Sequence, residues 1–325
     1  MFHFQTIEAR LISLNSALER IMPLIPIGGV VAGLLFYRVF APLKPIVNAL
    51  FAFITFSSAL AISPKRFFGA LTKIKPIALF LLWASVIMPL LSFTLASLLF
   101  TDPNLVTGFV LLTSIPTAMV GYVWSGIYHG DEPLSLVLIL VSTLLGPILT
   151  PLTVKIFAQK TVSIDTRAMI ISLLMMIVLP SLVGMLVNHT VGDKRTKKIT
   201  PSLKLFTKIA LFAIVTINIS QIAPTLLKKA TLAYIPIALL AATLALLGFP
   251  ASHALGKLAR LPLEESKSLT FAASMRNISA SMVLAINYFP PMTALPIIFG
   301  IITQQSICAI MASVLYGPKR KEQLK

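Results

Sequence analysis

The chain has 325 residues, of which 57% are hydrophobic and 11% are charged, and its mean hydropathy is +0.93. A soluble domain would be about one quarter charged, so the composition indicates a membrane protein. The net charge of +17 does not indicate a nucleic-acid partner, because the basic residues lie in short clusters between apolar runs. The single cysteine, Cys308, excludes an internal disulfide and a cysteine-based metal site.

Ten apolar runs are long enough, at about 20 residues, to cross a bilayer as helices. They are residues 22–40, 45–63, 76–99, 105–128, 133–158, 168–190, 205–223, 231–255, 268–286 and 293–316. Residues 1–21 are predicted to form an amphipathic segment on the cytoplasmic surface of the membrane, and residues 317–325 a basic cytoplasmic tail. We therefore expect an all-α, multi-pass protein of the cell membrane, surrounded by lipid and with no obligate protein partner implied.

Lysine and arginine indicate the orientation of these spans. Most of them fall on segments that face the cytoplasm if the N-terminus is inside, so both termini are expected there. Ten spans divide into two groups of five, 22–158 and 168–316, and an odd number per group makes the second insert upside down relative to the first. Inverted repeats of this kind are typical of secondary transporters, whose site lies near the bilayer midplane.

The fourth and ninth expected spans contain features that interrupt a helix. Pro116 lacks a backbone donor and should break the fourth span within residues 115–119. The ninth span, FAASMRNISASMVLAIN, carries a polar cluster at its middle that can satisfy the backbone of an unwound helix. Two interrupted spans at corresponding positions indicate a transport site, and the N-termini of the half-helices would attract an anion. Pro116 alone is more consistent with a structural role, whereas Arg276 and Asn277 favour function, because ionisable groups at bilayer depth are rare.

Four stretches resemble the bile acid:sodium symporter superfamily. They are IPTAMVGYVWSGIYHGDEPLSLVLILVSTLLGPILTP at 115–151, SPKRFFGAL and ASVIMPLLSF at 63–71 and 84–93, and SMRNISASMVLAINYFP in the ninth span. The resemblance implies ten helices in two parts: a core domain in which broken spans four and nine cross, and a panel domain beside it. It also implies that substrate enters between the two parts by alternating access.

The sodium ligands that the resemblance implies are mostly absent. This chain has Ala84 for a third-span glutamine, Gly121 and Tyr122 for a fourth-span Ser-Asn pair, Ser135 and Ile139 for two fifth-span hydroxyls, and Ala272 and Arg276 for a ninth-span glutamate and glutamine. Asn277, which lies near substrate in the family, is retained.

Arg276 leads to a hypothesis about the missing sodium site. A sodium site built from hard oxygen donors needs a carboxylate and several further oxygen ligands, and the carboxylate is absent. Arginine keeps its charge at any accessible pH, so the guanidinium is expected to replace the ion. No cofactor is expected, and the missing ligands argue against a bound sodium ion. It would hold the crossing helices together or bind the carboxylate of a small organic anion. The alternative is that it only caps the carbonyl groups of a broken helix.

Other polar and aromatic residues leave alternatives open. Tyr122 and Trp124 either line the substrate path or are ordinary lipid-facing aromatics. A polar patch in the tenth span either contacts substrate or holds helices together; it consists of Thr303, Gln304, Gln305 and Ser306. The carboxylates of the connections are expected to be solvated: Asp131, Glu132, Asp165, Glu264 and Glu265. The candidate site residues are Arg276, Asn277, Ser274, Ser279, Pro116, Thr117, Gly121, Tyr122, Ser135, Thr303 and Gln304.

Three functions fit these features. The first is a secondary transporter of a small organic anion that lacks the usual sodium sites. The second is a sodium-coupled symporter whose ion sites are rebuilt from Ser135, Asn277 and backbone carbonyl groups. The third is a sensor that keeps the fold without transporting. An enzyme is not expected, because the spans carry no paired carboxylates and the chain has no H-E-x-x-H or G-x-S-x-G motif.

Overall fold

A computed structural model describes residues 24–60, 71–157, 165–228 and 231–317. Within these ranges the chain is helical, and the sole strand-like feature is an isolated β-bridge between Thr117 and Arg276. The expected all-α class is confirmed. The predicted amphipathic segment 1–21 and all but the first residue of the predicted tail 317–325 lie outside the described residues.

The chain divides into two compact units. Unit 1 comprises Met1–Phe68 and Arg167–Lys229, and unit 2 comprises Gly69–Thr166 and Ala230–Lys325. Each unit therefore takes segments from both halves of the sequence. The inverted repeat over 22–158 and 168–316 stays a prediction.

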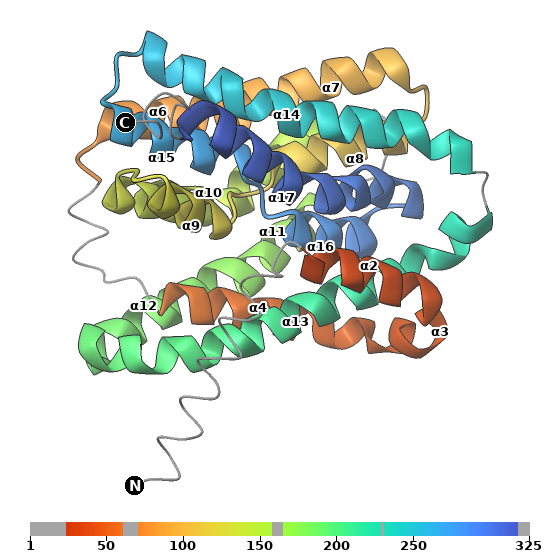
Figure 1. Cartoon of the computed structure of the whole chain (residues 1–325). Coiled ribbons are helices and arrows are strands. Elements are labelled where there is room, and N and C mark those ends of the chain that lie inside the picture. The colour runs from red at the N-terminus through yellow and green to blue at the C-terminus, as the bar shows by residue number, and fades with distance from the viewer. Residues whose placement is uncertain (1–23, 61–70, 158–164, 229–230, 318–325) are drawn as a thin grey trace, which may run out of the picture. The chain divides into compact units, whose positions relative to one another are not determined.

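The helical elements of unit 1 are α2 (Leu24–Leu35), α3 (Tyr37–Phe40), the 3₁₀ turn η1 (Ala41–Ile46), α4 (Val47–Ala59), α11 (Thr166–Leu173), the π-helical turn η3 (Leu174–Val178), α12 (Leu179–Val191) and α13 (Asp193–Lys228) (Figure 1). The long helix α13 packs against α2, α3, η1, α4 and α12. The expected boundary between spans 22–40 and 45–63 differs from the structure, which stays helical from Tyr37 to Ala59. Pro42 lies at the start of η1, where a missing backbone N–H costs little, so it does not end the helix.

Unit 2 holds the remaining helices. They are α6 (Ile74–Leu82), the π-helical turn η2 (Trp83–Ile87), α7 (Met88–Leu99), α8 (Pro103–Ser114), α9 (Val120–Ile127), α10 (Glu132–Phe157), η4 (Thr231–Tyr234), α14 (Ile235–Leu258), α15 (Leu263–Ser274), α16 (Ile278–Tyr288), η5 (Pro291–Thr293) and α17 (Ala294–Tyr316) (Figure 1).

In the described ranges, seven helical segments are long and apolar enough to cross a membrane. They are Tyr37–Ala59, Ile74–Leu99, Glu132–Phe157, Thr166–Val191, Leu205–Pro224, Leu232–Leu258 and Pro291–Tyr316. Three more apolar helices are shorter: α2, α8 and α16. The chain is therefore a multi-pass membrane protein, and the expected spans four and nine are each divided into two short helices.

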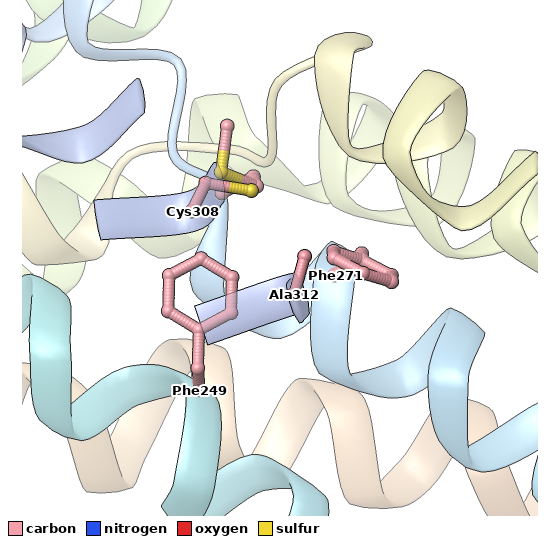
Figure 2. Close-up of a cluster of buried hydrophobic side chains, with 5 residues drawn as sticks. Phe249, Phe271, Cys308 and Ala312 are labelled. Atoms are coloured by element: carbon pink, nitrogen blue, oxygen red, sulfur yellow. The ribbon is translucent and has the colours of Figure 1, made fainter. Parts of the chain in front are cut away.

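An apolar cluster joins α14, α15 and α17. It consists of Phe249, Phe271, Met275, Cys308 and Ala312, all buried (Figure 2). The rings of Phe249 and Phe271 meet edge to face, with centroids 6.4 Å apart. Cys308 acts here as a small apolar core residue. Since Met275 directly precedes Arg276, this cluster fixes the end of α15 beside the break.

Candidate functional site at the crossing of two broken helices

The two interrupted spans meet at their breaks, residues 115–119 and 275–277, which we call the crossing. Helix α8 ends at Ser114 and α15 ends at Ser274. The segments that follow pair in antiparallel fashion: the Ala118 amide donates to the carbonyl of Met275 at 2.9 Å, and the Asn277 amide donates to the carbonyl of Pro116 at 2.9 Å. Both predicted interruptions are confirmed, and the first falls at Pro116 as expected.

Thr117 connects the crossing to its surroundings. Its amide donates to Ser142 Oγ of α10 at 3.0 Å. Its hydroxyl lies within hydrogen-bonding distance of two carbonyl oxygens of the other broken span. One is the carbonyl of Met275, at 3.0 Å, and the other is the carbonyl of Ala272. Backbone groups freed by the breaks are therefore satisfied within unit 2, as a membrane interior requires.

Gly146 of α10 provides the space that Pro116 occupies. A Cβ atom at this glycine would lie 2.2 Å from Cγ of Pro116, which is far inside van der Waals contact. The residue at 146 must therefore lack a side chain for the proline to pack at the break.

Arg276 lies buried at the crossing, with 6% of its surface exposed. Its Nη1 donates to the carbonyl of Ile115 at 3.4 Å, and its Nη2 donates to the carbonyl of Ala84 at 3.3 Å. Ile115 follows the end of α8, and Ala84 lies in the π-helical turn η2, a kind of turn that is frequent at functional sites. No carboxylate of the described residues pairs with the guanidinium. A permanent positive charge is thus held among carbonyl dipoles alone.

Gln304 of α17 binds the backbone of Arg276. The Arg276 amide donates to Oε1 at 2.8 Å, and Nε2 donates to the Arg276 carbonyl at 3.0 Å. Thr303 instead donates to the carbonyl of Phe299 in its own helix, at 2.8 Å. Within the polar patch of the tenth span, the structure therefore gives Gln304 a contact between helices and Thr303 a bond within one helix.

The remaining polar residues of the ninth span have local partners. Asn277 is the N-cap of α16, and its side chain accepts from the Ala280 amide at 3.4 Å. Ser274 Oγ is hydrogen-bonded to Ser252 Oγ of α14 at 3.2 Å. Ser279 is half-buried near the start of α16. The structure thus brings Arg276, Asn277, Pro116, Thr117 and Gln304 together at the crossing, with Ser274 at its border.

Ser135, Gly121 and Tyr122 are not held together with Arg276. Ser135 Oγ donates to Ser125 Oγ at 2.7 Å, and Ser125 Oγ lies 3.1 Å from Ser268 Oγ. A Cβ at Gly121 would lie 3.1 Å from the carbonyl of Phe271, so this glycine lets α9 approach α15. The Tyr122 hydroxyl donates to Glu132 Oε2 at 3.2 Å at the protein surface.

The expectation that Asp131 and Glu265 are merely solvated is wrong. The carboxylates of both residues bind Nζ of Lys73, and the distance from Nζ to the Glu265 carboxylate is 2.8 Å. The side chains of Asp131 and Glu265 are 16% and 17% exposed. The cluster joins the residue before α6 to the starts of α10 and α15. Burial lowers the pKa of Lys73, but the hydrogen bonds and charges of Asp131 and Glu265 raise it by more, so its pKa lies above the ordinary 10.5.

Arg276 lines two small cavities within unit 2. The first, of about 30 Å³, has mainly apolar walls that include Met88, Leu112 and Leu244, together with the polar side chains of Ser274 and Gln304. The second, of about 10 Å³, has apolar walls that include Leu81, Ile115 and Leu149, together with four hydroxyl residues: Ser85, Ser114, Ser142 and Thr150. No sequence pattern singles out these four residues, because serine and threonine are common in spanning helices.

The chain is similar to known proteins over most of its length. Residues 48–229 match the family described as the Sodium Bile acid symporter family. The chain is 36% identical to the uncharacterized protein YbaS of Bacillus subtilis over 305 residues, which cover 94% of this chain and 99% of that protein. It is 26% identical to the uncharacterized sodium-dependent transporter YocS of B. subtilis over 82% of this chain and 81% of that protein. It is 28% identical to the probable sodium/metabolite cotransporter BASS1 of Arabidopsis thaliana chloroplasts, over 79% of this chain and 62% of that protein.

Proposed function

The chain belongs to the sodium bile acid symporter family, and on this premise we propose that it carries a small organic anion across the cell membrane without the family's sodium sites. Membership makes it a secondary transporter of organic solutes and not an enzyme. In the proposal, the guanidinium of Arg276 takes the place of the coupling cation, and transport proceeds by alternating access.

The contacts of the guanidinium carry this proposal. Sodium is bound by oxygen atoms, backbone carbonyl groups among them. Arg276 already donates to the carbonyl oxygens of Ala84 and Ile115, so it competes with a cation for the same ligands. At about 4 Å and an effective dielectric constant of about 20, two unit positive charges repel by roughly 4 kcal/mol, which is close to a thousandfold loss in affinity.

The field at the crossing favours an anionic substrate. Helices α9 and α16 begin at the two breaks and α8 and α15 end there, so their dipoles oppose one another and the guanidinium supplies the net positive charge. The guanidinium is also suited to bind a carboxylate through two parallel hydrogen bonds. The substrate in this proposal is therefore a small organic molecule with at least one carboxylate.

The names of two relatives, a sodium-dependent transporter and a probable sodium/metabolite cotransporter, favour a second candidate, which is sodium-coupled transport. It would need ion sites rebuilt from Ser135, Asn277 and backbone carbonyls. The hydroxyl of Ser135 is bonded to Ser125, and the side chain of Asn277 caps α16. Both would have to leave these partners to bind an ion.

Uptake into proteoliposomes separates the two candidates. Radiolabelled pyruvate, succinate and cholate are offered with an inward gradient of sodium or of choline. The proposal predicts that at least one of these anions enters equally well with either cation, and that Arg276→Gln abolishes its uptake. Arg260→Gln, at an exposed arginine of the same unit, is the matched control and should transport normally. Uptake by wild type that requires the sodium gradient would refute the sodium-free mechanism and establish the second candidate.

The proposed orientation has both termini in the cytoplasm. A green fluorescent protein fused after the last residue should then fluoresce in bacterial cells, whereas alkaline phosphatase fused there should be inactive. The opposite pair of results would show that the orientation expected from lysine and arginine is wrong.

A further inference from the structure

The charge of Arg276 is poorly compensated by the residues around it. The guanidinium has five N–H donors, and the described residues supply two acceptors, both at more than 3.2 Å. Buried cations are normally paired with an opposite charge, because two long bonds to neutral carbonyls do not offset the loss of water. A bound anion would supply the missing charge.

The cavity lined by hydroxyl residues is the smaller of the two cavities that Arg276 lines. Its volume is about 10 Å³, against about 30 Å³ for the mainly apolar cavity. The smaller volume favours a small ion over the organic substrate.

Ser114 supplies a hydroxyl that has no partner in the described part of the chain. Its Oγ is buried, and 7% of the residue is exposed. A buried hydroxyl without a hydrogen bond lowers stability, and such groups call for a specific explanation. The backbone at this position is held in place, because Thr150 Oγ1 donates to the Ser114 carbonyl at 2.8 Å.

Ser142 supplies a second hydroxyl proton. Its Oγ accepts from the Thr117 amide at 3.0 Å, so its own proton remains available for another acceptor. Thr150 has already given its proton to Ser114. The cavity thus offers a fixed positive charge and two hydroxyl donors, which suits an anion better than a cation.

We propose that the cavity lined by Ser114, Ser142 and Arg276 binds a single chloride ion, or another small halide, as the counter-ion of the guanidinium. The site goes beyond the proposed transport of an organic anion and does not require it. Chloride would neutralise the charge from the cavity lined by hydroxyl residues, while the mainly apolar cavity is lined by a different set of residues apart from Arg276.

Thermal unfolding of the full-length protein in detergent tests the site without any organic anion present. Gluconate is replaced stepwise by chloride at constant ionic strength, once with sodium and once with choline. The midpoint should rise by about 2 °C or more and then saturate, equally with both cations, and bromide should substitute for chloride. Equal midpoints in chloride and gluconate would overturn the proposal.

Ser114→Ala separates ligand binding from structure. A merely structural hydroxyl without a partner predicts an unchanged or higher midpoint in every salt. The proposal predicts that the midpoint in gluconate is likewise unchanged or higher than that of wild type. It also predicts that the chloride concentration needed for half of the chloride-induced rise in midpoint increases tenfold or more.

The matched control is Ser92→Ala, a buried serine whose hydroxyl donates to the carbonyl of Phe109 at 2.8 Å. The control should lose stability in all salts and keep the chloride response. A full chloride response in Ser114→Ala would refute the site even if Arg276 variants fail to fold, and a failure of transport leaves this result unaffected.

Discussion

The side-chain amide of Gln304 pairs with both backbone groups of Arg276. The Arg276 amide donates to Oε1 at 2.8 Å, and Nε2 donates to the Arg276 carbonyl at 3.0 Å. Residue 276 lies between α15 and α16, where the regular helical hydrogen bonds are interrupted. Helix α17 thus fixes the backbone from which the guanidinium extends, and this link gives the position of the charge a physical cause.

Replacing this amide should destabilise the crossing. In Gln304→Met the Arg276 amide loses its acceptor in a buried place, so the free energy of unfolding should fall by about 1–3 kcal/mol. Thr303→Val is the control, because Thr303 is less buried and its bond lies within its own helix. Thermal or denaturant unfolding in detergent measures both variants. Equal stability of the two variants would show that Gln304 does not hold the crossing.

Gly146 should not tolerate a methyl group. A Cβ at this position would lie 2.2 Å from Pro116 Cγ, so Gly146→Ala should cost about 1–3 kcal/mol by displacing the broken segment. At Gly126 the nearest atom is Glu132 Oε1, at 3.6 Å. Gly126→Ala should therefore be neutral or gain up to about 1 kcal/mol, because alanine favours helix. The prediction fails if the two alanine variants unfold at the same midpoint.

Lys73 should stabilise the meeting of α6, α10 and α15. Lys73→Met leaves the carboxylates of Asp131 and Glu265 without their cation, and we expect a loss of about 1–3 kcal/mol. Lys75→Met is the control, since Lys75 is exposed and donates to a carbonyl of Ala259. When thermal unfolding midpoints are compared at neutral pH, Lys75→Met should lose less stability than Lys73→Met.

The pH dependence of that contribution follows from the raised pKa of Lys73. A lysine whose pKa is higher in the folded state stabilises fully below its ordinary pKa of 10.5, and the stabilisation disappears as pH rises through the folded value. The difference between wild type and Lys73→Met should therefore stay constant from neutral pH up to about 10. A difference that vanished in this range would contradict the ion cluster.

Local chemistry explains which parts of the site were predictable. Pro116 removes a backbone donor wherever it lies, so the break in span four could be predicted, and the polar run around Arg276 marked the second break. The hydrogen-bond acceptors of the guanidinium could not be predicted. They are the backbone carbonyl groups of Ala84 and Ile115, and every residue carries such a group. The Lys73 cluster joins residues 58 and 192 positions apart, for which a single sequence gives no signal.

The same limit applies to individual side chains. The family resemblance placed Ser135 at an ion-ligand position, yet its hydroxyl is bonded to Ser125. Gln304 was identified as polar, but only the fold decides that its amide meets the backbone of Arg276. The unpartnered Ser114 is one of many serines in apolar segments, and its importance comes from burial without a hydrogen bond.

The central claim is that the guanidinium of Arg276 takes the place of the coupling cation. The most direct test is the thermal midpoint of the purified protein in sodium and in choline, both as gluconate salts with the chloride concentration held equal, for wild type and for Ala272→Glu/Arg276→Gln. The double variant removes the guanidinium and adds a carboxylate one turn away. The account predicts that sodium does not change the midpoint of wild type and raises that of the double variant. Stabilisation of wild type by sodium would contradict it.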